Sequence, residues 1–120
     1  ENIQIFGDGS QSRDFTFVDD IASGTISAIK HVGYEIINLG GGRDPVSLNT
    51  IIEMLESLIG RKAKIDYKPF HAADMLETRA DVRKAKGKLG WEPKVSLDKG
   101  LEKSVQWYVD NRHWLKEVQV

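Results

Sequence analysis

The sequence has no cysteine among its 120 residues and only three prolines. The lack of cysteine excludes disulfides and thiolate metal sites on this chain and is typical of a reducing compartment. No apolar run approaches the roughly 20 residues that a bilayer-spanning helix needs, and no secretory signal is visible. We therefore expect a cytoplasmic protein without a membrane partner.

A strong overall charge is also missing, because the formal net charge is only −1. This balance disfavours a general binder of polyanions. The charge is uneven, however, since nine basic and four acidic residues lie in the range 61–88. That segment lacks interleaved aromatic residues and any nucleic-acid-binding motif, so we interpret it as a solvated face and expect no nucleic-acid partner.

The chain length is that of one ordinary domain, and we expect residues 1–120 to form a single domain. The first six residues already alternate like a half-buried strand, with no methionine or leader before them. We therefore expect this chain to be a portion of a longer one.

Periodicity predicts an α/β fold with about four strands and four helices. Strands are expected at residues 3–6, 15–18, 35–39 and 63–68. Helices are expected at residues 21–31, 48–59 and 82–89, with a last helix after Ser96. Residues 35–39 lack clean alternation, which suits a strand covered on both faces of a parallel sheet.

Helix boundaries are marked by capping residues and glycines. Asp19 or Asp20 is expected to cap the first helix, Ser47 the second and Asp81 the third. The expected end points of these helices are Gly33, Gly60 and Gly90.

Two glycine-rich turns lack the spacing of a dinucleotide-binding loop. Gly40-x-Gly42 is followed by Pro45 where a third glycine would fall, and Gly7-x-Gly9 is followed by Ser12. No Walker lysine is present either. We interpret both as chain turns and expect no cofactor-binding residues on this chain.

Histidine and tryptophan positions indicate structure more than chemistry. His31, His71 and His113 are far apart in sequence and form no close-spaced metal-ligand pattern, so no metal site is predicted. His31 is expected at a helix C-terminus, where it would interact with the negative end. The three tryptophans, at positions 91, 107 and 114, are interpreted as core or edge packing.

Arg13 follows the glycine-rich segment 7–12 and precedes an apolar, acid-terminated run. Its planar guanidinium is suited to bidentate recognition of phosphate or carboxylate oxygens. The alternative is a structural pair with Asp14 or Asp19 at a strand–helix junction. Spacing alone leaves both interpretations open.

Six motifs in series resemble the C-terminal portion of an NAD-dependent nucleotide-sugar epimerase/dehydratase of the extended short-chain dehydrogenase family. They lie at residues 3–9, 13–21, 37–40, 74–85, 89–93 and 101–108. The resemblance covers essentially the whole chain and is strongest to the UDP-glucuronate and UDP-glucose 4-epimerases. It implies the small substrate-binding portion of a Rossmann-type enzyme.

The resemblance implies four substrate-binding residues for a UDP-sugar. Phe6 matches the position whose backbone contacts the nucleotide base, and Arg13 matches the arginine that holds the diphosphate. Asp74 matches an acid near the ribose. His71 stands where some relatives carry a second phosphate-binding arginine, and is a weaker, pH-dependent donor.

The family's catalytic Tyr-x-x-x-Lys pair is absent, because none of the three tyrosines has a lysine four positions later. We therefore expect no catalytic residues here. In the full-length family enzyme NAD accepts the hydride, and an N-terminal Rossmann domain or a partner chain would supply that site.

Two functions follow as hypotheses. The first is the UDP-sugar-binding portion of an epimerase, inactive on its own. The second is a free-standing binding or oligomerisation module, since residues 35–39 resemble a strand that joins the Rossmann sheet. Its unpaired edge would invite self-pairing into a homodimer.

Overall fold

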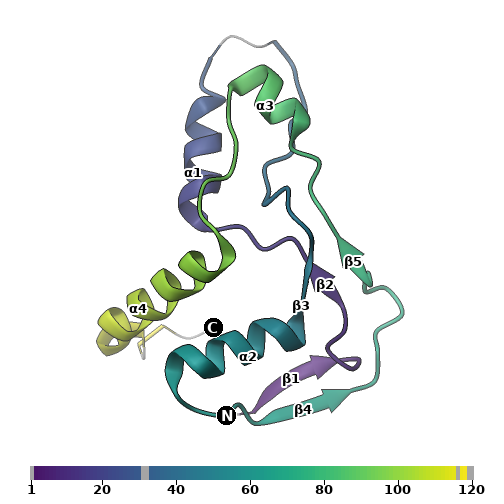
Figure 1. Cartoon of the computed structure of the whole chain (residues 1–120), viewed down its shortest axis with the longest axis vertical. Helices are drawn as coiled ribbons and strands as arrows, with labels where there is room; N and C mark the ends of the chain where they lie inside the picture. Colours follow the sequence, from purple (N-terminus) through teal and green to yellow (C-terminus); the bar gives the residue numbers. More distant parts are fainter. Residues whose placement is uncertain (1, 31–32, 116, 119–120) are drawn as a thin grey trace.

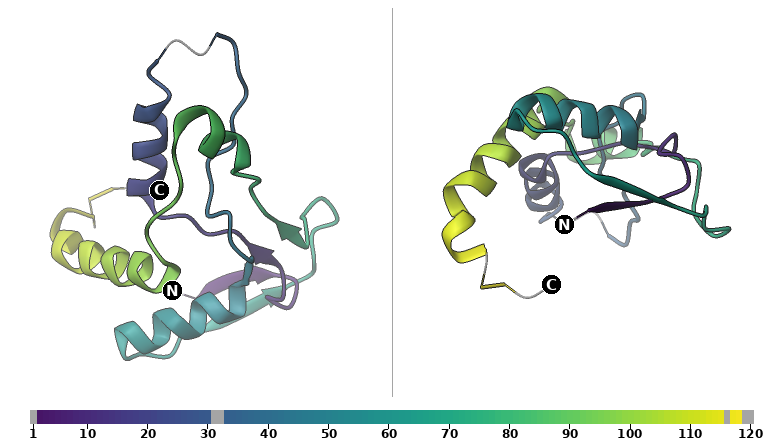
Figure 2. Two further views of the ribbon diagram at one scale, coloured as in Figure 1. Left: turned by 45° about the horizontal axis from the view of Figure 1, so that its top comes forward. Right: turned by 90° about the horizontal axis from the view of Figure 1, so that it is seen from below.

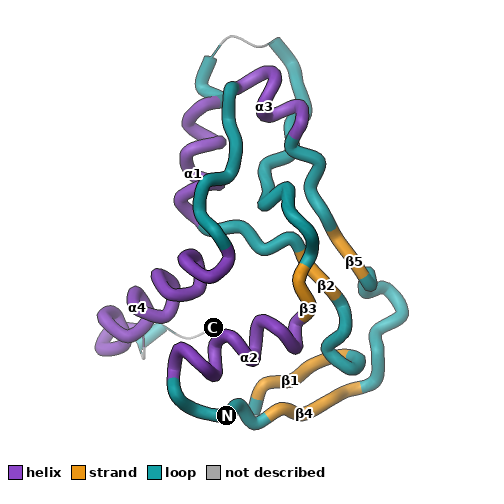
Figure 3. Tube along the Cα trace, in the orientation of Figure 1, coloured by secondary structure: helices purple, strands orange, loops and turns teal. Residues whose placement is uncertain are grey.

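The computed structural model describes residues 2–30, 33–115 and 117–118. Within these ranges the chain forms four helices and five short strands, which confirms the α/β class (Figures 1 and 3). The helices are α1 (Val18–Ser27), α2 (Leu48–Ile59), α3 (Arg83–Leu89) and α4 (Leu97–Leu115). The strands are β1 (Ile3–Phe6), β2 (Ser12–Arg13), β3 (Val46–Ser47), β4 (Ile65–Lys68) and β5 (Glu77–Thr78).

The strands form two small sheets. β1 pairs with β4 in parallel, in register from Ile3 opposite Ile65 to Phe6 opposite Lys68. β2 is the central strand of the other sheet, antiparallel to β3 and parallel to β5. Helix α2 lies over the β1–β4 pair, and α4 runs beside α2 (Figures 1 and 2).

The cluster of buried apolar residues lies at the opposite end of the molecule, where α1 and α3 are side by side (Figure 1), while the buried Ile5 and Ile51 lie on β1 and α2. Trp91 is buried there with Ala85 and Leu89, as expected of a core tryptophan. Its indole N–H donates to the Asp20 carbonyl and the Ser23 hydroxyl, both at 3.0 Å. The buried indole therefore has its polar atom satisfied.

The other two tryptophans lie on α4. Trp107 and Trp114 pack edge to face, with ring centroids 6.0 Å apart. Trp107 is exposed and Trp114 is likewise on the surface. Trp107 and Trp114 therefore pack at the edge of the molecule, which is one of the two roles expected for the tryptophans.

Several helix boundaries follow their predicted signals. The Ser47 hydroxyl accepts a hydrogen bond from Thr50 N at 3.1 Å and caps α2, which ends at the left-handed Gly60. At α3 the prediction differs by one position, because Val82 and not Asp81 is the N-cap residue, although the Asp81 carboxylate accepts from Arg83 N at 3.0 Å. The Ser96 hydroxyl accepts from Lys99 N at 3.4 Å, where α4 begins.

The first helix is present, but its bounds differ from those predicted. α1 runs from Val18 to Ser27 rather than over 21–31, and the expected strand at 15–18 does not form. In this part of the chain only Ser12 and Arg13 form a strand, because these are the two residues that pair with β3 and β5. His31, which was expected at the C-terminal end of this helix, lies outside the described residues.

Neither Asp19 nor Asp20 caps α1. The N-cap residue is Phe17, and no side chain bonds the first helical N–H groups. The buried Asp20 carboxylate instead accepts from Lys94 N at 3.0 Å and Val95 N at 2.9 Å. Backbone donors more than 70 residues away therefore replace the local ones.

Residues 35–39 do not form the expected strand. No backbone–backbone hydrogen bond from residues 33–40 reaches any residue that the structure describes. The physical reason is that none of the strands in the described ranges pairs with them. Glu35 instead anchors the segment to α3 by ion pairs with Lys84 at 2.7 Å and Lys88 at 3.1 Å.

Within residues 2–30, 33–115 and 117–118, no helix has both the length and the apolar character of a membrane span.

Candidate functional site

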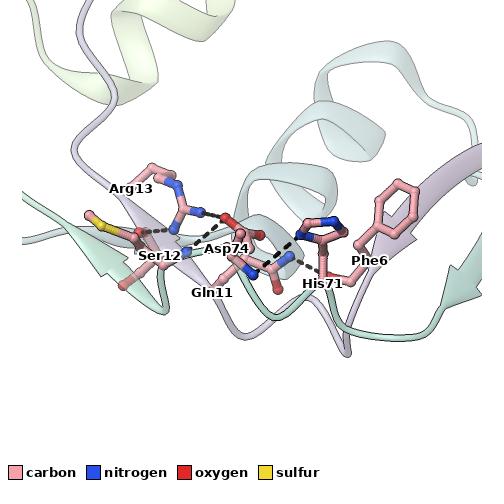
Figure 4. A network of polar contacts seen from close by, with 8 residues as sticks. Phe6, Gln11, Ser12, Arg13, His71 and Asp74 are labelled. Carbon is pink, nitrogen blue, oxygen red and sulfur yellow. Dashed lines mark hydrogen bonds and ion pairs between the residues drawn. The ribbon is translucent and has the colours of Figure 1, made fainter.

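The four predicted substrate-binding residues lie in one region (Figure 4). Phe6 ends β1 and Arg13 lies in β2, while His71 and Asp74 belong to the connection between β4 and β5. Since β4 pairs with β1 and β5 pairs with β2, this connection must cross from one sheet to the other. The two parallel pairings therefore bring His71 and Asp74 to Phe6 and Arg13.

Arg13 pairs with Asp74, 61 positions away. Its Nη2 donates to Asp74 Oδ1 at 2.6 Å, and its Nη1 donates to the Ser12 carbonyl at 2.8 Å. Both side chains are partly exposed, at 27% and 33%. The guanidinium has five N–H donors, so three remain beyond these two contacts.

The alternative pairing of Arg13 with Asp14 or Asp19 is not formed. Asp14 Oδ2 accepts from Gly42 N at 2.8 Å and from Ala80 N at 3.1 Å. The Asp19 carboxylate lies 3.7 Å from the Lys103 ammonium. Arg13 is thus directed to the loop between β4 and β5 rather than to its sequence neighbours.

The segment around His71 is held by short-range hydrogen bonds. Asp74 N donates to the His71 carbonyl at 2.8 Å, and Ala73 N donates to His71 Nδ1 at 3.3 Å. Asp74 Oδ1 also accepts from Met75 N at 2.9 Å. In the neutral tautomer that the Ala73 contact favours, the proton is assigned to Nε2, which can donate to an acceptor.

Phe6 is held in place by a residue that sequence reasoning missed. The buried Gln11 donates from Nε2 to the Phe6 carbonyl at 2.7 Å. Ser12, the next residue, donates its N–H to the Leu76 carbonyl at 2.8 Å. A glutamine in a glycine-rich turn carries no distinctive pattern, so only the tertiary structure shows that Gln11 holds the Phe6 carbonyl.

The Gly40–Gly42 turn does not form a cradle for a cofactor phosphate. A Cβ at Gly41 would meet the Asp14 carboxylate, and one at Gly42 would meet Val82. The Gly42 N–H, which a phosphate would need, already donates to Asp14. The turn therefore packs against the protein's own side chains and does not fit NAD.

No three histidine, aspartate or glutamate side chains in the described ranges are placed to hold a metal ion.

The sequence model of the family described as GDP-mannose 4,6-dehydratase matches residues 1–104, and the chain belongs to this family. A UDP-glucuronate 4-epimerase of Thermodesulfobacterium geofontis is 56% identical over 98% of this chain and 36% of its own length.

Solved structures agree with this assignment. The UDP-glucuronic acid 4-epimerase of Bacillus cereus, in complex with UDP-glucuronic acid and NAD, is 37% identical with a TM-score of 0.82. The match covers 92% of this chain and 36% of that one. The UDP-glucose 4-epimerase of Thermotoga maritima with UDP-glucose is 37% identical with a TM-score of 0.84, over 93% and 36%.

The chain thus spans about a third of the length of these relatives. The predicted resemblance to a portion of a nucleotide-sugar epimerase is confirmed.

Proposed function

We propose that this chain is the UDP-sugar-binding portion of an NAD-dependent epimerase and has no epimerase activity alone. The observation that carries the proposal is the Arg13–Asp74 pair, formed between positions that the family resemblance assigns to one ligand. His71 lies in the same network, because its carbonyl accepts from Asp74 N, and Phe6, whose carbonyl accepts from Gln11, lies close by (Figure 4).

Each residue has a separate binding role. The remaining donors of Arg13 hold the diphosphate, because a guanidinium pairs well with phosphate oxygens. Asp74 fixes the guanidinium through Oδ1, and its Oδ2 can accept a ribose hydroxyl. The Phe6 carbonyl has a second lone pair beside its bond from Gln11, which can accept from the base.

The catalytic groups and NAD would belong to the remaining two thirds of a full-length enzyme, on the same chain or a partner. NAD supplies hydride transfer in the family. Two features support docking of that part at the segment following α1. Its backbone groups at 33–40 make no backbone–backbone hydrogen bonds with the described residues, and Tyr34 and Ile36 are exposed. Such an edge can accept an added strand.

Calorimetric titration with UDP, UDP-glucose and UDP-glucuronate tests the proposal. We expect saturable binding, and Arg13→Ala should weaken it by about 10- to 100-fold because a charge-assisted contact is lost. Arg83→Ala is the matched control, since that arginine pairs with Asp81 on α3. Turnover of either sugar nucleotide by the 120-residue chain would refute the claim that it is inactive alone.

A second candidate is a free-standing binding or oligomerisation module, favoured by the same unpaired segment. Two copies could pair through residues 35–39 and form a homodimer. Light scattering over a concentration series distinguishes this case. A monomer at high concentration that still binds UDP would favour the first function.

A further inference from the structure

A hollow of about 430 Å³ lies between α2 and α4, on different elements from the Arg13 network. Both helices contribute apolar side chains to it. These are Leu55 and Ile59 of α2, and Val105, Tyr108 and Val109 of α4. The two helices pack together but do not fill the space between their C-terminal parts.

Two arginines also line this hollow, Arg61 and Arg112. The sequence has six arginines, and the other four side chains bond to a carboxylate or a carbonyl. The guanidinium groups of Arg61 and Arg112 alone make no hydrogen bond or ion pair with any residue the structure describes. Two exposed guanidinium groups that pair with none of the described residues thus border the same apolar surface.

Helix dipoles account for only part of this arrangement. Arg112 lies in the last turn of α4, and Arg61 follows Gly60 at the end of α2. A cation at each negative helix end is favourable. The dipole does not explain why apolar side chains remain exposed between these two charges.

We propose that this hollow binds an amphipathic helix of a partner protein, whose carboxylates pair with Arg61 and Arg112. The apolar face of the incoming helix packs on Ile59, Tyr108 and Val109, while its acidic residues lie over the two arginines. Arginine and tyrosine are enriched at protein interfaces, where they often carry much of the binding energy.

The depth of the hollow favours a helix over a small molecule. Ile59, Tyr108 and Val109 are 58%, 57% and 60% exposed. A small ligand on such a shallow surface would remain largely in water, whereas small-molecule sites bury about 70–90% of their ligand. A helix would cover the whole groove, and the two helical walls, whose backbone groups are already paired, leave side-chain contacts as the recognition mode.

The site is independent of sugar-nucleotide binding, because it shares no residue with the Phe6, Arg13, His71 and Asp74 set. It therefore stands or falls separately from the proposed function.

The test uses two labelled helical peptides and fluorescence anisotropy with the full 120-residue chain. Both carry leucines spaced three and four positions apart; one has glutamates beside the leucines and the other has lysines there. We expect the glutamate peptide to bind at least about tenfold more tightly, since the arginines attract one peptide and repel the other.

Variants localise the binding. The double variant Arg61→Ala/Arg112→Ala should bind the glutamate peptide about tenfold more weakly. Arg83→Ala should leave the affinity for this peptide unchanged. Val109→Glu should also weaken it, because a carboxylate in the hollow competes for the arginines. Val109 is exposed, and circular dichroism verifies that each variant is folded.

Three results would overturn the proposal. They are equal binding of the two peptides, binding that is insensitive to the arginine variants, and no peptide binding. Decanoate serves as the small-molecule probe. Decanoate binding that depends on Arg61 and Arg112, with no peptide binding, would identify a site for small amphipathic anions instead.

Discussion

The carboxylate of Asp20 accepts a hydrogen bond from Val95 N at 2.9 Å, although 75 positions separate the two residues. Its other oxygen accepts from Lys94 N at 3.0 Å. This contact holds the segment between α3 and α4 against α1. It is the reason why an acid at the start of a helix is buried rather than solvated.

Asp20→Ala should therefore destabilise the fold. Two backbone N–H groups lose a charged acceptor, and the expected loss is about 2–4 kcal/mol in the free energy of unfolding. Urea denaturation followed by circular dichroism measures it. Asp19→Ala is the control and should change stability by less than about 0.5 kcal/mol, since its pair with Lys103 is exposed. Equal losses in both variants would contradict this role of Asp20.

Two helical glycines should respond to alanine in opposite directions. A Cβ at Gly24 would lie 2.9 Å from side-chain atoms of Leu39 and Trp91. Gly24→Ala should therefore push α1 away from the core and destabilise the protein. Gly87 in α3 has open space around it, and Gly87→Ala should stabilise the protein by about 0.5–1 kcal/mol through helix propensity. The thermal unfolding midpoints of the two variants test this, and a shift in the same direction for both would contradict the packing around Gly24.

The ion pair at the start of α3 should be visible in a pH titration. Hydrogen bonds from Arg83 lower the pKa of the Asp81 carboxyl from its ordinary 3.8 to about 2. Because the folded-state pKa is depressed, the pair's contribution is complete above about pH 4 and is lost as the pH falls toward 2. An NMR titration of the Asp81 carboxyl in the wild-type chain should show its protonation in this pH range.

Arg83→Ala should return the Asp81 pKa toward 3.8, since the guanidinium is the main cause of the shift. An unchanged titration in that variant would mean that another group lowers the pKa of this carboxyl.

Asp74 should influence sugar-nucleotide affinity through Arg13. Asp74→Asn keeps the shape of the side chain but removes the charge that holds the guanidinium at 2.6 Å. We expect UDP-glucuronate to bind about 3- to 30-fold more weakly in calorimetry, as one charge-assisted contact is lost. Asp66→Asn is the control, because Asp66 pairs with Lys68 in β4. Unchanged affinity for Asp74→Asn would exclude Asp74 from the site.

Local sequence patterns correctly predicted those elements whose apolar periodicity and end residues all lie within the element itself. Helix α2 has an apolar stripe, a serine cap and a terminal glycine, and its bounds are as expected. Strand β1 alternates and lies where predicted. Family motifs indicated four site residues that the structure brings into one region (Figure 4).

The misassigned elements depend on distant partners. Residues 35–39 have the composition of a strand, but a strand forms only where a neighbour accepts its backbone bonds, and the described residues provide none. Asp20 has the composition of an N-cap, but backbone N–H groups of Lys94 and Val95 bind its carboxylate instead.

The sequence by itself determined the α/β class, the position of α2, and the absence of the catalytic tyrosine–lysine pair. Only the tertiary structure decided that Arg13 pairs with Asp74 rather than with an adjacent aspartate, and that the Gln11 side chain donates to the Phe6 carbonyl. The physical reason is that local periodicity is set by neighbouring residues, whereas a buried or charged polar group pairs with whichever partner the fold brings within hydrogen-bond distance.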